Sequence, residues 1–242
     1  MAGLKFLPFR HTAASPATGL YIPLYVYPAG KGAADYDRVV SAKIAHPSVP
    51  MVVALNPGSG PGTSRDENYV FAGGRLQGAG ITVIGYVYTS WGKRRLSEVA
   101  ADIARYAEWY GLDGVMVDEF ATNPGLEGYY RHVRDYARSL GMGFVMGNPG
   151  TDIPESFVGL ASNFIIYENA GLPDKSRIGG WHGDYGKENW SICVHGVGFD
   201  EKRLRAASRH LGFVYMTDDT LPNPYDSVCS YLERMAEALA AS

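Results

Sequence analysis

The chain has 242 residues, of which 46% are hydrophobic and 19% are charged, and its formal net charge is −3. This composition permits a large core and argues against a disordered chain. Because Lys and Arg cluster only at residues 93–95, the sequence also argues against binding to nucleic acid or to an anionic membrane surface.

The sequence shows no targeting signal and no clear disulfide pattern. Residues 1–10 lack an apolar run long enough for the core of a signal peptide, and no segment reaches the length of a transmembrane helix. We therefore expect a cytoplasmic protein if the chain stands as given, or a secreted one if a leader was removed. Cys193 and Cys229 lie far apart without a metal-type spacing, which favours buried free thiols and leaves a single disulfide as the alternative.

Short apolar runs alternate with helical segments along the whole chain. The predicted strands cover residues 20–27, 50–55, 81–88, 114–120, 143–147, 163–167, 191–197 and 212–216. The predicted helices cover residues 35–45, 66–77, 97–110, 126–140, 201–211 and 226–240. The helices after the fifth and sixth strands look short and irregular. Eight alternations without a linker predict an α/β fold with a single (β/α)8 TIM-type barrel over residues 1–242, of which 1–19 form an N-terminal extension.

The predicted strand at 114–120 ends in two adjacent carboxylates, Asp118 and Glu119. Asp and Glu are depleted inside strands, and ligands and catalysts lie at the C-terminal ends of barrel strands. The alternative is that Asp118 caps the following turn and that Glu119 is solvated. Because neighbouring strand residues point to opposite sides, both carboxylates can face one cleft only if the strand has ended.

Polar and aromatic residues follow the other predicted strands as well. They are Tyr25, Tyr27, Asn56, Tyr86, Tyr88, Trp91, Asn148, Glu168, Asn169, His195, Asp218 and Asp219. A barrel brings these groups to one face, where aromatic rings can stack on the C–H surfaces of a sugar while carboxylates and amides bind its hydroxyls. Two carboxyl groups across a glycosidic bond can act as acid and as base or nucleophile.

Most of these residues also have a structural interpretation. A tyrosine can be a core residue with its hydroxyl at the rim, an Asn before Pro-Gly can form a turn, a strand histidine can be satisfied at the rim, and an aspartate can cap the next segment. These interpretations apply to Tyr25, Tyr86, Asn56, Asn148, His195, Asp218, Asp219 and Asp226. Glu168 is the hardest to explain in this way, because it follows an apolar strand in which nothing local needs its charge.

Signatures of other chemistries are missing from the sequence. It contains no G-x-S-x-G elbow, no H-E-x-x-H motif and no paired His or Cys spacing for zinc. Residues 58–62 superficially resemble a phosphate loop but lack its Lys-Ser/Thr ending. We therefore expect no metal and no cofactor.

A set of motifs lies in order along nearly the whole chain. The motifs are residues 56–62, 85–89 with 91–92, 113–114 with 118–119, 148–150, 167–168, and 217–219 with 224–225. Together they resemble the spherulin-4 (spherulation-specific family 4) domain. The resemblance implies a (β/α)8 barrel and a microbial glycoside hydrolase, typically secreted, that cuts galactosaminogalactan within N-acetylgalactosamine-rich stretches. It also implies that Asp118, Glu119 and Glu168 occupy the family's acidic active-site positions.

The leading hypothesis is a glycoside hydrolase that cleaves a hexosamine-containing polysaccharide by endo action. Asp118 is the predicted nucleophile or electrostatic stabiliser and Glu168 the predicted general acid/base, while Glu119 orients the pair or a substrate amine. The predicted substrate-binding residues are Tyr27, Asn56, Tyr88, Trp91, Asn148, His195 and Asp218. The distance between the two carboxyl groups decides between retention and inversion at the anomeric carbon.

Two other functions are compatible with the same barrel. A non-catalytic carbohydrate-binding or surface protein would still bind sugar after its carboxylates are changed to amides. A lyase or isomerase is the third hypothesis, which a metal ion clustered with Asp118, Glu119 and Glu168 would favour.

Overall fold

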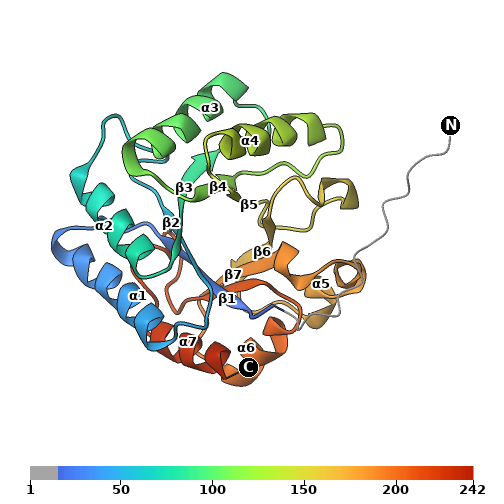
Figure 1. Ribbon diagram of the computed structural model, residues 1–242. Coiled ribbons are helices and arrows are strands. Elements are labelled where there is room, and N and C mark those ends of the chain that lie inside the picture. Colours follow the sequence, from blue (N-terminus) through green and yellow to red (C-terminus); the bar gives the residue numbers. More distant parts are fainter. Residues whose placement is uncertain (1–15, 242) are drawn as a thin grey trace.

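Short runs rich in Val, Ile, Leu and Met form the strands, and their residues are buried on both faces, as in a parallel sheet covered by helices. The computed structural model describes residues 16–241. The strands are β1 (Gly19–Leu24), β2 (Met51–Leu55), β3 (Thr82–Tyr88), β4 (Gly114–Asp118), β5 (Phe144–Gly147), β6 (Asn163–Ala170), β7 (Trp190–His195) and β8 (Phe213–Met216). They close into one parallel barrel in sequence order, with β8 pairing with β1, so the predicted (β/α)8 fold is confirmed (Figure 1).

The helices lie outside the barrel in Figure 1. They are α1 (Ala33–Ala45), α2 (Glu67–Gly78), α3 (Leu96–Arg105), α4 (Glu127–Ser139), α5 (Lys175–Ile178), α6 (Glu201–Ser208) and α7 (Leu232–Ala240). A π-helical segment, η2 (Tyr106–Tyr110), continues α3, and short 3-10 turns lie at η1 (Gly30–Gly32), η3 (Glu155–Phe157), η4 (Gly180–Asp184) and η5 (Lys187–Asn189). The connections after β5 and β6 hold only η3 and the short segments α5, η4 and η5, as the sequence indicated.

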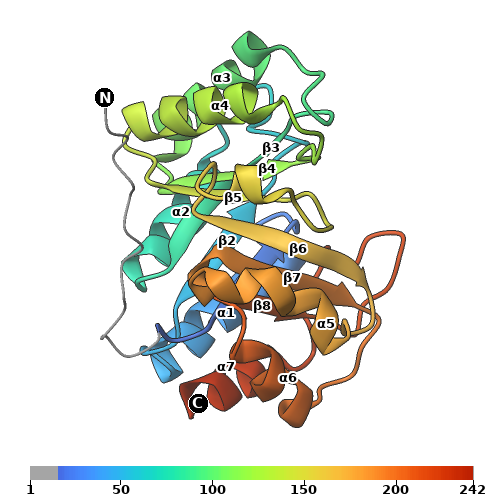
Figure 2. The same cartoon turned by 90° about the vertical axis from the view of Figure 1, so that its right-hand side faces the viewer.

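All strands run in one direction, so the loops that follow them share one end of the barrel. In Figure 2 the strands are seen from the side, and the arrow of β6 points to the right, toward the end where these loops lie. We call this end the C-terminal face of the barrel. The connections that lead from the helices into the strands lie at the opposite end.

Several predicted boundaries differ from the structure, and three of the differences bear on the candidate site. The first strand ends at Leu24, and β6 continues to Ala170, so Glu168 lies inside the strand rather than after it. The last helix begins at Leu232 instead of residue 226, so Asp226 is not its N-cap. The segment before α7 is held by side chains instead of helical bonds, because Asp218 accepts hydrogen bonds from the backbone and the hydroxyl of Ser230. The predicted extension at 1–19 falls largely on residues 1–15, outside the described part.

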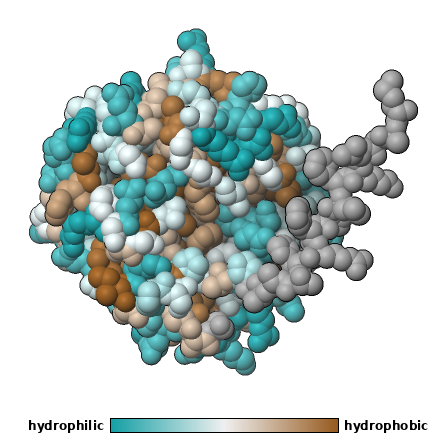
Figure 3. Space-filling view, in the orientation of Figure 1, coloured by the Kyte–Doolittle hydropathy of each residue, from teal (hydrophilic) through white to brown (hydrophobic). Residues whose placement is uncertain are grey.

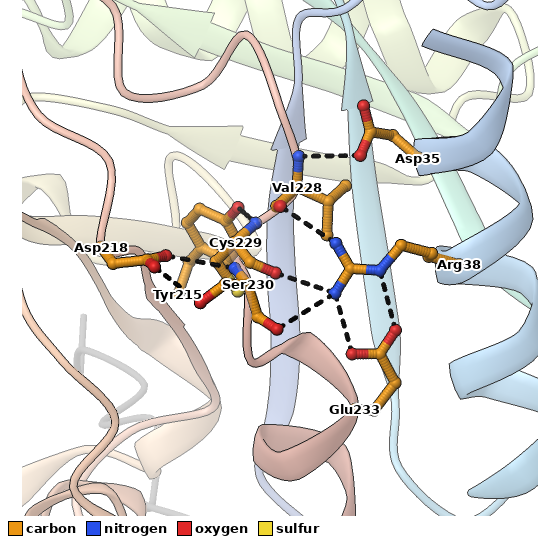
Figure 4. Close-up of polar contacts among 8 residues, drawn as sticks. All are labelled: Asp35, Arg38, Tyr215, Asp218, Val228, Cys229, Ser230 and Glu233. Atoms are coloured by element: carbon orange, nitrogen blue, oxygen red, sulfur yellow. Dashed lines mark hydrogen bonds and ion pairs between the residues drawn. The ribbon is translucent and has the colours of Figure 1, made fainter. Parts of the chain in front are cut away.

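An arginine ties the first helix to the last (Figure 4). Arg38 of α1 donates hydrogen bonds to the backbone carbonyls of Val228, Cys229 and Ser230, just before α7. It also forms an ion pair with Glu233 in the first turn of α7, with 2.9 Å between Nη2 and Oε2. The hydrogen bond from Arg38 lowers the pKa of Glu233. These contacts join the two ends of the barrel beside the pairing of β1 with β8.

Three further features of the structure can be compared with the expectations from the sequence: the distribution of hydrophobic residues on the surface, the state of the cysteines and the length of the helices. Figure 3 shows hydrophobic residues in separate brown patches among teal hydrophilic ones on the face seen in Figure 1. Cys193 and Cys229 are buried free thiols, which confirms the first of the two interpretations of these cysteines. Within residues 16–241, no helix is long and apolar enough to cross a membrane.

Candidate active site

Asp118 is the last residue of β4 and lies at the C-terminal face of the barrel. Tyr86 of the neighbouring strand β3 donates a hydrogen bond of 2.7 Å from its hydroxyl to Oδ2 of Asp118. Asn148, which directly follows β5, donates from its side-chain amide to Oδ1 over 2.9 Å. Both carboxylate oxygens therefore have a partner, and each partner comes from an adjacent strand.

Glu168 is held in the same way from the other side of the barrel. The hydroxyl of Tyr225 donates to Oε1 over 2.6 Å, and the amide of Asn148 donates to Oε2 over 2.7 Å. Behind this carboxylate, the buried thiol of Cys193 donates to the Tyr225 hydroxyl over 3.3 Å. Burial and the neighbouring Glu168 carboxylate raise the pKa of Cys193, so the thiol stays neutral.

A bulge in β6 aims Glu168 at this position. The pairing of β6 with β7 shifts by one residue between Ile165 and Tyr167, so that Glu168 lies opposite Cys193. Side chains alternate along a strand, and without the extra residue Tyr167 would occupy the inward position instead. The backbone N–H of Glu168 also donates to the carbonyl of Gly150 over 3.0 Å, which fixes the end of the strand against the loop after β5.

One amide nitrogen of Asn148 joins the two carboxylates. Because it lies 2.9 Å from Oδ1 of Asp118 and 2.7 Å from Oε2 of Glu168, these two oxygens are no more than about 5.6 Å apart. The Oδ1 of Asn148 accepts a hydrogen bond from the backbone N–H of Gly150, which orients the amide with its NH2 group toward the carboxylates. Asn148 is thus both the turn former and the polar site residue that the sequence offered as alternatives.

Three tyrosine rings line the wall behind the pair. Tyr25 packs edge-on against Tyr86 at a centroid distance of 5.8 Å and against Tyr225 at 5.9 Å. Such edge-to-face contacts fix ring orientation at little cost. The two tyrosines that bind the carboxylates are therefore braced by a third.

Burial raises the pKa of Asp118 to about 6 from an ordinary value of 3.8, and the charges of Glu168 and Glu119 add to the increase. The hydrogen bond from Tyr86 acts in the opposite direction because it stabilises the ionised carboxylate. Asp118 therefore carries a proton in a large part of the molecules slightly below neutral pH.

Glu119 follows β4 with a left-handed backbone, at φ +49°. The strand has therefore ended at Asp118, which is the condition for both carboxylates to face one cleft. The carbonyl of Glu119 accepts hydrogen bonds from the backbone N–H of Trp91 at 2.8 Å and the hydroxyl of Thr89 at 2.9 Å. Among residues 16–241, no side chain forms a hydrogen bond with the Glu119 carboxylate, which leaves its oxygens available to a ligand.

The predicted aromatic residues lie at the same end of the barrel, Tyr27 and Trp91 on the loops after β1 and β3 and Tyr88 at the last position of β3. Tyr27 is 48% exposed, and its hydroxyl is linked to Asp66 and Asn68 of the loop and helix that follow β2. Trp91 is 56% exposed and has a left-handed backbone. The ring of Tyr88 is covered on one face by the guanidinium of Arg94, at 4.2 Å.

Three other predicted site residues have structural partners in this protein. Asn56 accepts a hydrogen bond from the backbone N–H of Gly60 and so shapes the loop after β2. His195 is buried at the end of β7, where its carbonyl accepts from Gly171. The carboxylate of Asp218 binds Ser230, as Figure 4 shows. Their part in substrate binding stays a prediction.

The site also contains residues that the sequence interpretation missed. Tyr86 was interpreted as a rim tyrosine, although it shares its side of β3 with Tyr88, which was selected for the site. Tyr225 appeared only as part of a motif near the C-terminus. Its position against Glu168 depends on the path of the chain after β8, for which the local sequence carries no signal.

Comparison with known proteins places the chain in a family. The family model described as spherulation-specific family 4 matches residues 19–239. Spherulin-4 of Physarum polycephalum is 32% identical over 258 residues, which cover 99% of this chain and 75% of that protein. The resemblance inferred from the sequence motifs is thereby confirmed.

Solved structures share the barrel. Aspergillus clavatus Sph3, solved in complex with GalNAc, superposes with a TM-score of 0.82 at 24% identity, over 93% of this chain and 98% of that chain. A mannanase catalytic domain from Streptomyces sp. SirexAA-E has a TM-score of 0.55 at 15% identity, with coverage of 100% and 96%. The chitinase RmChi1 from Rhizomucor miehei has a TM-score of 0.55 at 11% identity, with coverage of 93% and 99%. At these identities the likeness concerns the fold. The family match and the homologous sequence establish that this chain belongs to spherulation-specific family 4.

Proposed function

We propose that this protein is a glycoside hydrolase that cleaves a hexosamine-containing polysaccharide with the carboxyl groups of Asp118 and Glu168. The observation that carries the proposal is the shared amide of Asn148, which holds the two carboxyl groups at a fixed separation. A tyrosine hydroxyl on each carboxyl group adds a second constraint. Such preorganisation on rigid strands suits a pair that acts across one bond.

The comparisons support the substrate class. The family relationship and the likeness to a barrel solved with GalNAc favour an N-acetylgalactosamine- or galactosamine-rich polymer. In our proposal the exposed rings of Tyr27 and Trp91 are stacking surfaces for further sugar units of the polymer.

The raised pKa of Asp118 favours a division of roles. In our proposal Asp118 is protonated before reaction and donates this proton to the glycosidic oxygen as the bond to C1 breaks. Glu168 acts as the nucleophile: its carboxylate oxygen attacks C1 and forms a glycosyl ester as the bond to the leaving oxygen breaks. Asp118, now ionised, then removes a proton from water, the water oxygen bonds to C1, and Glu168 leaves as carboxylate. This order reverses the one suggested from the sequence, because burial favours the protonated form of Asp118.

The test compares the wild type with Asp118→Asn and Glu168→Gln on a galactosamine-rich polymer, with products identified by mass spectrometry. Glu155→Gln is a matched control, because Glu155 also accepts a 2.6 Å hydrogen bond from a tyrosine, Tyr185, away from the pair. We expect oligosaccharides from the wild type and the control only. Equal release by all four proteins would show that other carboxylates do the chemistry.

A second substrate separates the two roles. In a dinitrophenyl glycoside the dinitrophenolate group leaves without being protonated. Asp118→Asn should therefore still form the glycosyl ester from this substrate, whereas Glu168→Gln should not. The reverse pattern would restore the original assignment.

The alternative function is a non-catalytic carbohydrate-binding protein on the same barrel. It is favoured by the exposure of Tyr27 and Trp91, which provide ring surfaces independent of the carboxylates. If a folded wild type releases no product and both amide variants bind the polymer as tightly as the wild type, this function replaces hydrolysis.

A further inference from the structure

A polar cavity of about 390 Å³ lies between the loops that follow β2 and β3. Residues 57–63 form one side, and Tyr88, Arg94 and Asp102 form the other. Both loops follow strand ends, so the cavity lies at the C-terminal face of the barrel. Its lining combines an aromatic ring, a guanidinium, hydroxyls and backbone groups, which is the set of contacts that a sugar ring uses.

Tyr88 connects this cavity with the catalytic pair. Its Cα is the register partner of Asp118 in the pairing of β3 with β4. Neighbouring strands lie about 4.8 Å apart, and side chains at paired positions point to the same side of the sheet. Tyr88 therefore lies beside Asp118 and also lines the cavity, so the cavity and the carboxylate pair adjoin at this residue.

The polar wall of the cavity is preformed. Arg94 donates to the Tyr88 carbonyl over 3.1 Å and to Oδ2 of Asp102 over 2.6 Å, while its plane covers the Tyr88 ring. The side chains of Arg94 and Asp102 are only 14% and 8% exposed. A buried pair held in this way keeps its geometry, so little order has to be created when a ligand binds.

The opposite wall is also fixed. Asn56 holds the backbone N–H of Gly60 at 3.0 Å, and the hydroxyl of Tyr110 donates to the carbonyl of Pro61 at 2.9 Å. Ser59 adopts a left-handed backbone at φ +49°, and Gly60 lies at φ +148°, directly over Asp102. These contacts fix the conformation of the loop at residues 57–63, so the cavity that it lines is a permanent feature of the fold.

The charges around the cavity select the ligand. Asp102 is the acidic residue of the lining, and it is already paired with Arg94 at 2.6 Å and Arg105 at 3.2 Å. Two guanidinium groups share one carboxylate, so an ammonium group would find no free counter-charge here. By contrast, the catalytic centre next to it carries Asp118, Glu119 and Glu168.

We propose that this cavity is a substrate subsite for an uncharged sugar unit, a hexose or an N-acetylhexosamine, adjacent to the unit bound at Asp118. The proposal rests on the proposed function for its polymer substrate and adds a location and a charge preference to it. Protonated galactosamine is excluded from this subsite and accepted at the acidic centre.

The test fills the cavity without touching the catalytic residues. Thr63 is exposed, lines the cavity and can be changed to Trp; Ser64→Trp places the same ring on the neighbouring exposed residue, which does not line it. The probes are N-acetylgalactosamine oligosaccharides, their de-N-acetylated counterparts and a short aryl glycoside. We expect Thr63→Trp to lower kcat/KM for the acetylated oligosaccharides roughly tenfold or more. The aryl glycoside should be unaffected, and Ser64→Trp should behave as the wild type.

Equal oligosaccharide rates for Thr63→Trp and Ser64→Trp would overturn the subsite. A wild type that handles acetylated and de-N-acetylated oligosaccharides equally would overturn the charge preference. If the wild type cleaves nothing, the proposed function fails, and calorimetric binding of the same oligosaccharides decides on the subsite. Weaker binding by Thr63→Trp alone would support it, and equal binding by the three proteins, or none, would reject it.

Discussion

The hydroxyl of Tyr225 donates a 2.6 Å hydrogen bond to Glu168, from a loop that lies 57 residues further along the chain. Tyr86 makes the corresponding bond to Asp118 from the strand next to it. The two catalytic candidates thus have matching tyrosine donors, one local in the barrel and one supplied by the loop that precedes α7. The loop after β8 is therefore part of the site.

Removing the Tyr225 hydroxyl should lower turnover more than binding. A hydrogen bond to a charged group contributes about 1.5–3 kcal/mol, so Tyr225→Phe should reduce kcat about 10- to 100-fold with a smaller change in KM. Tyr231→Phe is the control, since it deletes a hydroxyl with an equally short bond, to the carbonyl of Val197. Steady-state kinetics on the polymer check this. Equal kcat values for the two variants would contradict a role of Tyr225 beyond stability.

Replacing the shared donor Asn148 should lower turnover at least as much as replacing Tyr225. Asn148→Ala leaves one oxygen of Asp118 and one of Glu168 without a protein partner and removes the link that sets their separation. We expect kcat to fall at least as far as in Tyr225→Phe, with the far-ultraviolet circular dichroism spectrum unchanged. Asn189→Ala serves as control, because Asn189 donates its amide to a backbone carbonyl, that of Gly186. A fully active Asn148→Ala protein would show that the bridge is dispensable.

Asp118 should make the protein less stable as the pH rises. The folded protein holds the Asp118 proton up to about pH 6, whereas an unperturbed carboxyl loses it near 3.8. Between these values the folded state binds more protons than the unfolded chain, so the free energy of unfolding falls with increasing pH. Asp118→Asn removes this dependence. Above pH 6 the free energy of unfolding of Asp118→Asn should exceed that of the wild type by on the order of 2 kcal/mol.

Urea unfolding at a series of pH values measures this difference. The gap between Asp118→Asn and the wild type should narrow toward zero below about pH 4, where both side chains are neutral. A gap that stays constant from pH 4 to pH 7 would mean that the proton on Asp118 is not what distinguishes the two proteins.

The separation of the carboxyl groups predicts retention at the anomeric carbon. Retaining enzymes place the two groups roughly 5–5.5 Å apart and inverting enzymes roughly 6.5–9.5 Å. The bridge through Asn148 keeps Oδ1 of Asp118 and Oε2 of Glu168 within about 5.6 Å, close to the range of retaining enzymes and below that of inverting ones. Proton NMR of freshly released reducing ends should therefore show the anomer of the substrate linkage. Initial appearance of the opposite anomer would refute this assignment.

The sequence was sufficient for the barrel and for several residues of its candidate site. Eight apolar runs, each followed by polar residues, predicted the strands and their common end. Asp118 and Glu168 stood out because each is a carboxylate at the end of an apolar run. The structure brings both to Asn148, which the sequence could only offer as turn former or site residue.

What the sequence could not provide depends on contacts between distant segments. The bulge that orients Glu168 is a shift in register between β6 and β7, and the sequence of β6 contains no pattern that predicts it. The last predicted helix began too early because Asp226 was interpreted as its N-cap, although residues 226–231 consist of weak helix formers. In the folded chain, Asp218 and Asp219 bind Ser230 and Ser227 and hold this segment in another path. Tyr225 reaches Glu168 only along that path.

The loops after β3 and β4 hold three non-glycine residues with left-handed backbones: Ser90, Trp91 and Glu119. Each such conformation costs on the order of 1 kcal/mol, and the hydrogen bond from Trp91 to Glu119 couples two of them. Replacement of Ser90 by Gly would relieve part of this energy without removing a side chain that the site uses. Ser90→Gly should therefore raise the thermal stability of the protein, whereas a change at Trp91 or Glu119 would also remove a side chain of the candidate site.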